Sequence, residues 1–504
     1  MTIAGIDVGT TGCKCTVMDD TGRMLAQAYE EYEDERSELQ KREESKRGIR
    51  EIDAGGIWKS VCRVLEQGVN TSGHIDAIGV TSFGETCVFV GADGEPAAKA
   101  MLYTDVRGEE QSQRLIQHFG RESLGNVAGV MPASMFSLPK WMWIRENRPE
   151  LYEQTSWILP VADFIVFKLC GAAQTDYSLA ARTMAFDVRT LAWDRQILDY
   201  AGIDMEKLPR IVATGTKAGT IRPDVAGRLG LSDGTIIVTG CHDQVAAAVG
   251  TGILAEGMAV DGTGTVECIT PMFSHIPESA GLFQGNYAIV PYVSAGSYVC
   301  YAFSFTGGAL LKWFRDAIAS AEAKLLREQG KNPYEEWNRR VGDEPTGLLV
   351  LPYFAGAATP YMDPDAKGAV IGLTTETSSM ELYRALMEGV TYEMRLNIER
   401  LEKAGVHIAS LRATGGGAAS KVWLQMKADI LNLPIISMGA AQSGTLGCIM
   451  LTGVACGIYA DLEEAGRKLV REESVYTPRE EMHAAYEPLY VRYRGLYEAV
   501  KSVL

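Results

Sequence analysis

Short apolar runs separated by glycine- and threonine-rich turns open the chain. Residues Ile3–Val8 form the first apolar run, Gly9–Gly12 is a turn, and Cys13–Met18 forms the second run. Apolar runs of this length that are bounded by turn residues are typical of strands. The segment therefore predicts a β-hairpin, and the turn at Asp19–Gly22 predicts a third strand near Met24–Tyr29.

The same pattern returns in the second half of the chain. Met258–Val260 is a short apolar run, Asp261–Thr265 is a turn, and Val266–Thr270 is the second run. Two strand–turn–strand segments, one early in each half, suggest an internal duplication. Each half is therefore expected to begin with a similar β-hairpin.

Longer stretches alternate between helical periodicity and short apolar runs. Helices are predicted over Ile57–Gly68, Leu138–Asn147, Ile158–Leu169, Val245–Val249 and Ser379–Ala404. Strands are predicted over Ile75–Thr81, Cys87–Val90, Ile236–Gly240, Gly347–Pro352 and Ile408–Ala413. Because strands alternate with helices, we predict an α/β fold whose sheets are covered by helices.

The length of the chain predicts two domains. The chain has 504 residues, and a single hydrophobic core stops growing at roughly 250–300 residues. We place the main boundary near Ala246. This predicts an N-terminal domain of residues 1–245 and a C-terminal domain of residues 246–504.

Composition narrows the choice of partners. The formal net charge is -16, which argues against a nucleic acid or an anionic membrane, because both need a basic surface. A phosphate ligand is still allowed, since backbone N–H groups bind phosphate without net positive charge. The first residues show no basic leader and no cleavage-site pattern, so no export signal is expected, and the ten cysteines include no Cys-x-x-Cys. We therefore expect free thiols, no zinc site and a cytoplasmic location.

Three loops rich in glycine and threonine follow predicted strands: Gly9–Gly12, Gly262–Thr265 and Gly415–Gly417. Glycine lets backbone N–H groups approach a phosphate closely, and threonine hydroxyls add donors. A tight hairpin turn is the alternative for any one loop, but three such loops favour nucleotide phosphates. The chain contains no Gly-x-x-x-x-Gly-Lys-[Ser/Thr] and no Gly-x-Gly-x-x-Gly that opens a helix, so neither a P-loop nor a dinucleotide fold is expected.

Two aspartates stand at the ends of predicted strands. Asp7 precedes the first loop, where a carboxylate can support a hydrated Mg²⁺ against phosphates. The alternative for Asp7 is a turn-capping role. Asp243 ends an apolar strand and is followed by Gln244, so a potential base stands beside an amide that can fix a sugar hydroxyl. The alternative for Asp243 is a helix N-cap.

Motifs along almost the whole chain resemble the FGGY carbohydrate kinases, whose members include glycerol kinase, xylulokinase, gluconokinase and ribulokinase. The matching segments are Gly5–Thr11, Met135–Asn147, Thr175–Ser178, Phe186–Asp187, His242–Gln244, Thr306–Gly308, Trp313, Leu351–Tyr353, Thr359–Tyr361, Glu388–Gly389, Thr414–Gly417 and Trp423–Gln425. The resemblance implies two RNase H-like domains of the actin/hexokinase superfamily with a cleft between them.

The resemblance also implies a role for each matching residue. Asp243 resembles the catalytic base of the family, and Gln244 resembles its substrate-binding amide. Asp7 resembles the aspartate that supports Mg²⁺, which Asp7 and Asp243 would hold largely through water. The residues that match the ATP-binding loops and pockets are Thr10, Thr11, Gly12, Lys14, Thr265, Gly308, Lys312, Gly416 and Ser420.

Substrate choice is expected to depend on the segment Phe83–Thr86. Xylulokinases typically carry Gln-Met-His-Gly there and glycerol kinases carry Gln-Arg-Glu-Thr, and this chain matches neither. Glu85 fits the glycerol-type carboxylate, which accepts a hydroxyl. Gly84 stands where glycerol kinases have the arginine, and we expect its small size to leave space for a larger substrate.

Two further residues are expected near the substrate. Asp105 lies in a run that resembles Trp-Asn-Asp-x-Arg of xylulokinases, so it is predicted to bind sugar hydroxyls. The alternative is a surface ion pair between Asp105 and Arg107. Met135 replaces a tyrosine that glycerol kinase has near its substrate.

Taken together, these motifs predict an ATP-dependent kinase that phosphorylates a hydroxyl of a ketopentose or sugar alcohol, with xylulose as the leading candidate and ATP and Mg²⁺ as cofactors. Two other interpretations are open: an actin-like or chaperone-type ATPase that acts on no sugar, and a sugar sensor without catalysis. The Asp243–Gln244 pair favours the kinase. A homo-oligomer is expected only by analogy with the family.

Overall fold

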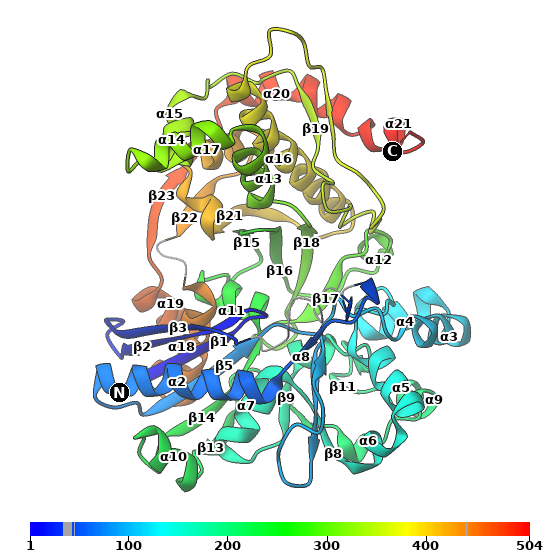
Figure 1. Ribbon diagram of the computed structural model, residues 1–504, viewed down its shortest axis with the longest axis vertical. Coiled ribbons are helices and arrows are strands. Elements are labelled where there is room, and N and C mark those ends of the chain that lie inside the picture. The colour runs from blue at the N-terminus through cyan, green and yellow to red at the C-terminus, as the bar shows by residue number, and fades with distance from the viewer. Residues whose placement is uncertain (34–42, 45, 439–441, 504) are drawn as a thin grey trace. The chain divides into compact units, whose positions relative to one another are not determined.

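The computed structural model describes residues 1–33, 43–44, 46–438 and 442–503 (Figure 1). The chain forms two compact units that interleave along the sequence. The first unit consists of Met1–Leu254, Ala288–Val299 and Gln442–Val470, and the second consists of Ala255–Tyr287, Cys300–Ala441 and Arg471–Leu504. Both units combine a mixed sheet with helices, which confirms the predicted α/β class.

The sheet of the first unit is built around the predicted N-terminal hairpin. Strand β1 (Thr2–Val8) pairs antiparallel with β2 (Gly12–Asp19), which in turn pairs with β3 (Met24–Glu31). On its other side β1 pairs parallel with β5 (Ala77–Ser82), and β5 pairs parallel with β14 (Ile236–His242). β1, β5 and β14 are almost wholly buried, as expected for parallel strands that are covered on both faces.

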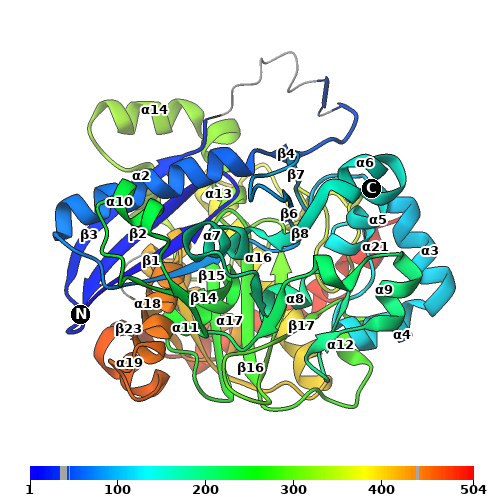
Figure 2. The same ribbon diagram turned by 90° about the horizontal axis from the view of Figure 1, so that it is seen from below.

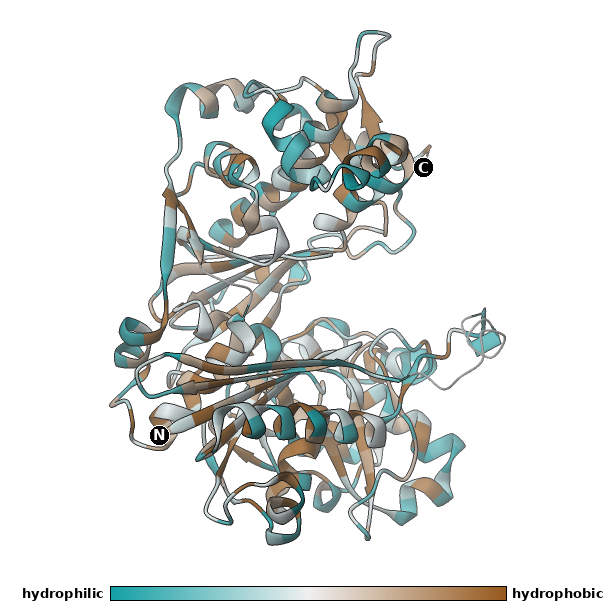
Figure 3. Cartoon of the chain, turned by 60° about the vertical axis from the view of Figure 1, so that its left-hand side comes forward, coloured by the Kyte–Doolittle hydropathy of each residue, from teal (hydrophilic) through white to brown (hydrophobic). Residues whose placement is uncertain are grey.

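Helices cover the two faces of this sheet (Figure 2). Helix α2 (Ala54–Ser72) packs its apolar side on β2, and α7 (Val161–Cys170) joins the same core. Helix α18 (Ser443–Ala455) covers β1 and β5. A Cβ added at Gly5 of β1 would meet the carbonyl oxygen of Thr445 at 2.2 Å, and one added at Gly79 of β5 would meet Oγ1 of Thr452 at 2.2 Å. In Figure 3 the hydrophobic colours accordingly gather on the central strands.

The second unit repeats this pairing. Strand β15 (Gly257–Thr263) pairs antiparallel with β16 (Glu267–Phe273) and parallel with β21 (Ile408–Thr414). The order continues through β22 (Ile435–Met438) to β23 (Glu472–Tyr476) on one side. An antiparallel partner on one side and a parallel partner on the other is the arrangement of β1, so the expected repeat of the hairpin is confirmed at the level of strand pairing.

Two helices of the second unit begin directly after loops that follow strands. Helix α13 (Gly308–Trp313) comes after the strand β18 (Tyr298–Ser304), and α17 (Lys421–Leu431) comes after β21. The long helix α16 (Ser379–Lys403) starts with a capping box between Ser378 and Glu381.

One predicted helix is wrong in its first three residues. Residues 158–160 belong to the strand β8 (Thr155–Pro160), which pairs antiparallel with β6 (Cys87–Gly91), and α7 begins only at Val161. Pro160 explains the break, because proline in a helix interior removes a backbone hydrogen bond and clashes with the preceding turn. An apolar run cannot by its periodicity alone separate a buried strand from a buried helix.

All ten cysteines are free thiols. Among the helices of the described residues, none combines the length and apolar character that crossing a bilayer requires.

Candidate functional site

The carboxyl ends of three parallel strands lie level with one another in the first unit. Val8 of β1 pairs in register with Ser82 of β5, and Ser82 pairs with His242 of β14. Loops that follow such strand ends form the ligand sites of α/β proteins. Asp7, the turn after Ser82 and Asp243 are therefore brought to one edge of the sheet.

Asp243 is the first residue of helix α11 (Asp243–Gly250), and His242 is the N-cap. The carboxylate of Asp243 is partly accessible, with 32% of the side-chain surface exposed. The Nε2 of Gln244 donates to Oδ1 at 3.4 Å, and Nε2 of His242 lies 3.3 Å from the same oxygen. The side chain thus stands at the edge of the sheet with an amide and an imidazole beside it.

The surroundings of Asp243 move its pKa toward neutral pH. Burial, followed by the negative charges of Asp7 and Glu85, raises the pKa of Asp243 to about 7. Burial and the nearby Arg182 hold the pKa of His242 well below its usual range, so this imidazole is neutral. A carboxylate with a pKa near the working pH is the effective form of a general base.

Asp7 is the second carboxylate of this edge. In β1 it pairs in register with Lys14 of β2. Burial raises its pKa, while the charge of Lys14 acts in the opposite direction. Gly444, in the first turn of α18, approaches it so closely that an added Cβ would lie 3.0 Å from the Oδ2 of Asp7. Asp7 therefore faces the positive end of a helix dipole.

The turn after β5 carries Glu85, whose backbone is left-handed with a φ of 61°. Its carboxylate accepts a hydrogen bond from Nε of Arg182 at 2.7 Å, and both side chains are buried. Arg182 lies directly after α8 (Tyr177–Ala181). The sequence gives no signal for this pairing, because the two residues are 97 positions apart.

The expected space at Gly84 is not there. A Cβ added at Gly84 would lie 2.9 Å from Cγ of Arg182 and 2.9 Å from Cδ2 of His242. These two side chains fill the volume that a larger residue would take. Gly84 is therefore small because it packs against Arg182 and His242, and its lack of a side chain opens no room for a larger substrate.

Removing Arg182, the buried partner of Glu85, is expected to lower the free energy of unfolding much more than removing one partner of a surface ion pair. Arg182→Met leaves a buried carboxylate without its partner, and the free energy of unfolding should fall by about 3–5 kcal/mol. The control is Arg222→Met, which breaks the exposed pair with Asp224 and should cost ~0.2–1 kcal/mol. Denaturant unfolding of both variants measures the difference, and equal losses would contradict it.

Asp105 and Met135 occupy different surroundings in the same unit. Asp105 is fully buried and pairs with Arg107 at 2.6 Å, while the backbone N–H of Arg50 donates to it at 2.8 Å. Burial acts to raise the pKa of Asp105, but the hydrogen bonds from Arg107 and Arg50 bring it below its usual value. The ion pair with Arg107 is thus present, although buried and not at the surface. Met135 is half-buried against the core.

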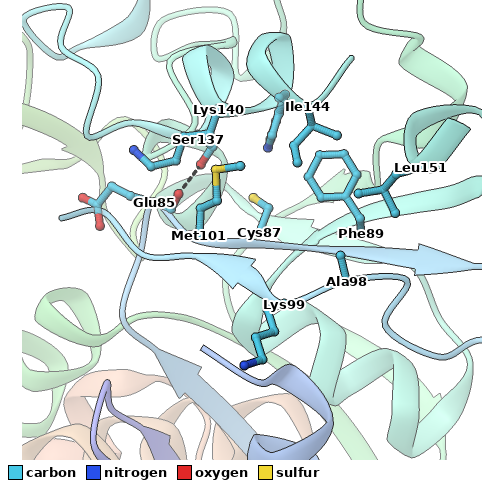
Figure 4. A pocket seen from close by; sticks show the side chains of 11 residues that line it. Glu85, Cys87, Phe89, Ala98, Lys99, Met101, Ser137, Lys140, Ile144 and Leu151 are labelled. Carbon is cyan, nitrogen blue, oxygen red and sulfur yellow. Dashed lines mark hydrogen bonds between the residues drawn. The ribbon is translucent and has the colours of Figure 1, made fainter. Parts of the chain in front are cut away.

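A small apolar cavity lies behind Glu85 (Figure 4). Ser137 donates a hydrogen bond to the backbone oxygen of Glu85 at 2.8 Å, and Lys140 lies on the same side of the cavity. The remaining wall consists of Lys99 and of apolar side chains that include Phe89 and Ile144. Its volume of about 10 Å³ has room for one water at most. The hydrogen bond from Ser137 therefore supports the Glu85 turn, and the cavity is too small for a sugar.

The first glycine loop is a closed hairpin turn that also faces open space. The N–H of Gly9 donates to the oxygen of Gly12 at 2.9 Å. A Cβ at Gly12 would lie 2.5 Å from the oxygen of Glu30, so only glycine fits there. Thr10 and Thr11 line a cavity of about 450 Å³. Lys14 follows on β2.

The other predicted ATP-binding residues lie in the second unit. Gly308 N–H donates to the oxygen of Gly264 at 2.8 Å, and the N–H groups of Gly307 and Ala309 donate to the oxygen of Thr265. The start of α13 is thereby fastened to the β15–β16 turn. Lys312 lies further along α13.

The glycine loop after β21 packs on the same turn. A Cβ at Gly415 would lie 2.6 Å from the oxygen of Thr263, and one at Gly417 would lie 2.5 Å from Cγ2 of Thr263. A Cβ at Gly416 would meet nothing within 4 Å. Ser420 caps α17 by accepting from the N–H of Trp423 at 3.2 Å. Thr265, Gly308 and Gly416 are thus neighbours around one hairpin turn.

Sequence reasoning missed two buried cations beside these predicted sites. Arg182, next to Glu85, has no local signal. Lys427 of α17 has a weak one, because it is a lone lysine in the run Trp423–Leu431 that is otherwise largely apolar.

Comparison with known proteins gives one consistent family. The N-terminal domain of the FGGY family of carbohydrate kinases matches residues 2–250, and its C-terminal domain matches residues 258–456. The xylulose kinase of Bacillus subtilis (strain 168) is 27% identical over 505 residues, which cover 99% of this chain and 97% of the relative. The glycerol kinase of Polaromonas sp. (strain JS666 / ATCC BAA-500) is 28% identical over 500 residues, covering 94% of this chain and 95% of the relative.

A solved structure shares the fold. The ligand-bound xylulose kinase from Lactobacillus acidophilus superimposes with a TM-score of 0.88 at 25% identity, covering 100% of this chain and 99% of that chain. The predicted RNase H-like fold of the actin/hexokinase superfamily is thereby confirmed. The chain belongs to the FGGY family of carbohydrate kinases, enzymes that transfer a phosphoryl group to an alcohol group of a sugar or polyol.

Proposed function

We propose that this carbohydrate kinase transfers the γ-phosphoryl group of ATP to a hydroxyl of a ketopentose or sugar alcohol, with Asp243 as the general base. The observation that carries the proposal is the place of Asp243 at the strand ends of the first unit, with a pKa raised to about 7. A carboxylate in this state takes a proton from an alcohol as the alcohol attacks.

The residues around Asp243 have complementary tasks in this proposal. Gln244 fixes a substrate hydroxyl beside the base. Glu85 accepts a second hydroxyl, and Arg182 holds the Glu85 carboxylate in place. His242, whose pKa lies well below its usual range, does not compete with Asp243 for the proton of the substrate hydroxyl. Met135 is proposed at the edge of the sugar. Asp105 is proposed to act there through Arg107, because its own carboxylate is buried and accepts hydrogen bonds from Arg107 and Arg50.

The glycine-rich loops are proposed to hold ATP. Thr10, Thr11, Gly12 and Lys14 would contact its phosphates from the first unit. Thr265, Gly308 and Lys312 would contact the phosphates and ribose from the second unit, and Gly416 and Ser420 the adenosine. The hydroxyl of Ser420 already serves the N-terminus of α17, so we propose that Ser420 contacts adenosine through its backbone or its Cβ.

Mg²⁺ fits the carboxylates of the first unit. Burial raises the pKa of both Asp7 and Asp243, and the charge of Asp7 raises that of Asp243 further. A divalent cation would offset this repulsion. Asp7 and Asp243 would hold it, largely through water, and it would neutralise charge on the phosphoryl oxygens.

The relatives indicate the class of the substrate but do not agree on one sugar. One of them is named for xylulose and the other for glycerol, which supports a small substrate rich in hydroxyl groups. Glu85 fits either, since it accepts a hydroxyl. We place xylulose first because the whole chain resembles xylulokinases.

A coupled assay of ADP release tests the proposal directly. The panel contains xylulose, ribulose, xylitol, glycerol and gluconate, each with MgATP. We expect turnover that depends on a ketopentose or a sugar alcohol. Equal ATP hydrolysis without any sugar would favour an actin-like or chaperone-type ATPase. Sugar binding by calorimetry without turnover would favour a sensor.

A further inference from the structure

A lysine is buried in the second unit next to the β15–β16 turn. Lys427 lies on α17, and only 2% of its side-chain surface is exposed. Its Nζ is 2.6 Å from Oδ2 of Asp261, 3.0 Å from Oε1 of Glu267 and 2.6 Å from Oγ1 of Thr263. Both carboxylates are 1% exposed. We name these four residues the Lys427 cluster.

The partners of Lys427 flank the turn on both sides. Asp261 and Thr263 are in β15, Glu267 is the first residue of β16, and the turn itself lies between them. Thr263 also donates to Oδ1 of Asp261 at 3.1 Å. One ammonium group therefore ties together the two ends of the hairpin turn that carries Thr265.

The same turn touches the loop that leads into α17. Thr263 has Lys427 at its hydroxyl, Gly417 against its Cγ2 and Gly415 against its carbonyl oxygen. Both glycines are so close to Thr263 that any side chain would force the loop away. Lys427 thus fastens α17 to the hairpin at the place where the two loops meet.

The charges of the Lys427 cluster balance only with one extra proton. The charged groups that act on Glu267 are Lys427 from α17 and Asp261 from β15. Burial raises the pKa of Glu267; Lys427 counters this effect and Asp261 adds to it. With Glu267 protonated, the buried cluster carries one positive and one negative charge. With Glu267 ionised, a net negative charge would be left buried, which is unfavourable.

We propose that Lys427 is a positioning residue for the nucleotide: it clamps the β15–β16 hairpin to α17 so that the turn at Thr265 and the glycine loop at Gly416 keep a fixed geometry. The inference rests on the proposed binding of ATP by these two loops. No atom of Lys427 needs to touch the nucleotide. Its effect is to hold both loops before the nucleotide arrives, which lowers the cost of ordering them on binding.

The first test removes the clamp. Lys427→Met should weaken binding of MgADP, measured by calorimetry, by about tenfold or more, since a buried pair is broken beside the site. Arg384→Met is the matched control, because Arg384 pairs with Glu388 in α16 of the same unit and both side chains are similarly buried. The control should lose stability while it binds MgADP as the wild type does.

Hydrogen–deuterium exchange of the ligand-free protein measures how firmly the two loops are held when no nucleotide is bound. In Lys427→Met the amides of residues 262–266 and 415–420 should exchange faster than in the wild type and in Arg384→Met. Unchanged exchange in a folded Lys427→Met protein would overturn the inference. If the wild type fails to bind MgADP, the proposed function falls, and the exchange still decides whether the clamp exists.

A gentler variant keeps the shape of the cluster. Glu267→Gln replaces the protonated acid by a neutral side chain of the same size. In the wild type the affinity for MgADP should fall as the pH rises from 7 to 9, and in Glu267→Gln it should stay level. If the affinity for MgADP falls equally in both proteins, the role of Glu267 is overturned. Because Glu267→Gln keeps the shape of the cluster, it also provides a test should Lys427→Met fail to fold.

Discussion

Asp243→Asn slows phosphoryl transfer by roughly 10²–10⁴-fold and leaves nucleotide binding unchanged; this is the result we expect if Asp243 is the general base. Asparagine keeps the size of the side chain but cannot accept the alcohol proton. The loops proposed to hold ATP are formed by other residues, so the affinity for ADP should persist; it is measured without Mg²⁺, because Asp243 is also proposed to hold the ion. Steady-state turnover and calorimetry on the same preparation measure the two quantities.

The control for this variant is Asp224→Asn, an exposed carboxylate of the same unit that should leave turnover unchanged. The dependence on pH gives an independent reading. A base must be deprotonated to act, and burial with the charges of Asp7 and Glu85 raises the pKa of Asp243 to about 7. Wild-type turnover should therefore be highest above pH 7 and fall as the pH drops through 7. Full turnover in Asp243→Asn would show that another group takes the proton.

Gly447→Ala should severely destabilise the first unit, because it adds a methyl group where two helix backbones touch. Helices α11 and α18 cross there: a Cβ at Gly447 would lie 1.9 Å from the oxygen of Ala246, and one at Gly250 would lie 1.9 Å from the oxygen of Ser443. Overpacking of a tight core costs about 1–3 kcal/mol and occasionally more. Because backbone atoms cannot turn aside, we expect a loss at or above the top of that range.

This loss should extend to activity, because α11 begins with Asp243. Thermal unfolding and turnover of the variant measure both effects. Gly227→Ala is the matched control. Gly227 lies in α10 (Pro223–Leu229), where an added Cβ meets nothing within 4 Å, so alanine should raise stability by up to about 1 kcal/mol. A Gly447→Ala protein as stable as the wild type would mean that the two helices can separate without cost.

Local pattern predicts much of the fold because its elements are short and strongly marked. The hairpin at the start of each half, and the long helix α16, follow from apolar runs, turn residues and helical periodicity. The end of strand β8 is wrongly predicted as helix, since its apolar run continues into α7 and only Pro160 marks the border.

Contacts between distant residues are beyond the reach of the pattern. Asp105 and Arg107 are two positions apart, and their pairing can be named from the sequence, although their burial cannot. Glu85 and Arg182 meet only because β5 and α8 are packed in one unit. The expectation of space at Gly84 is wrong for the same reason, as the residues that fill this space come from elsewhere in the chain.

Helix α18 has a further consequence for how the protein is made. It covers β1 and β5 but is encoded near the end of the chain, in the segment Gln442–Val470. While the ribosome is still translating the second unit, the strands at the start lack the cover that α18 provides. The apolar face of β1 and β5 that α18 covers therefore stays exposed in the nascent chain through most of its synthesis. The unit that emerges first from the ribosome is completed only near the end.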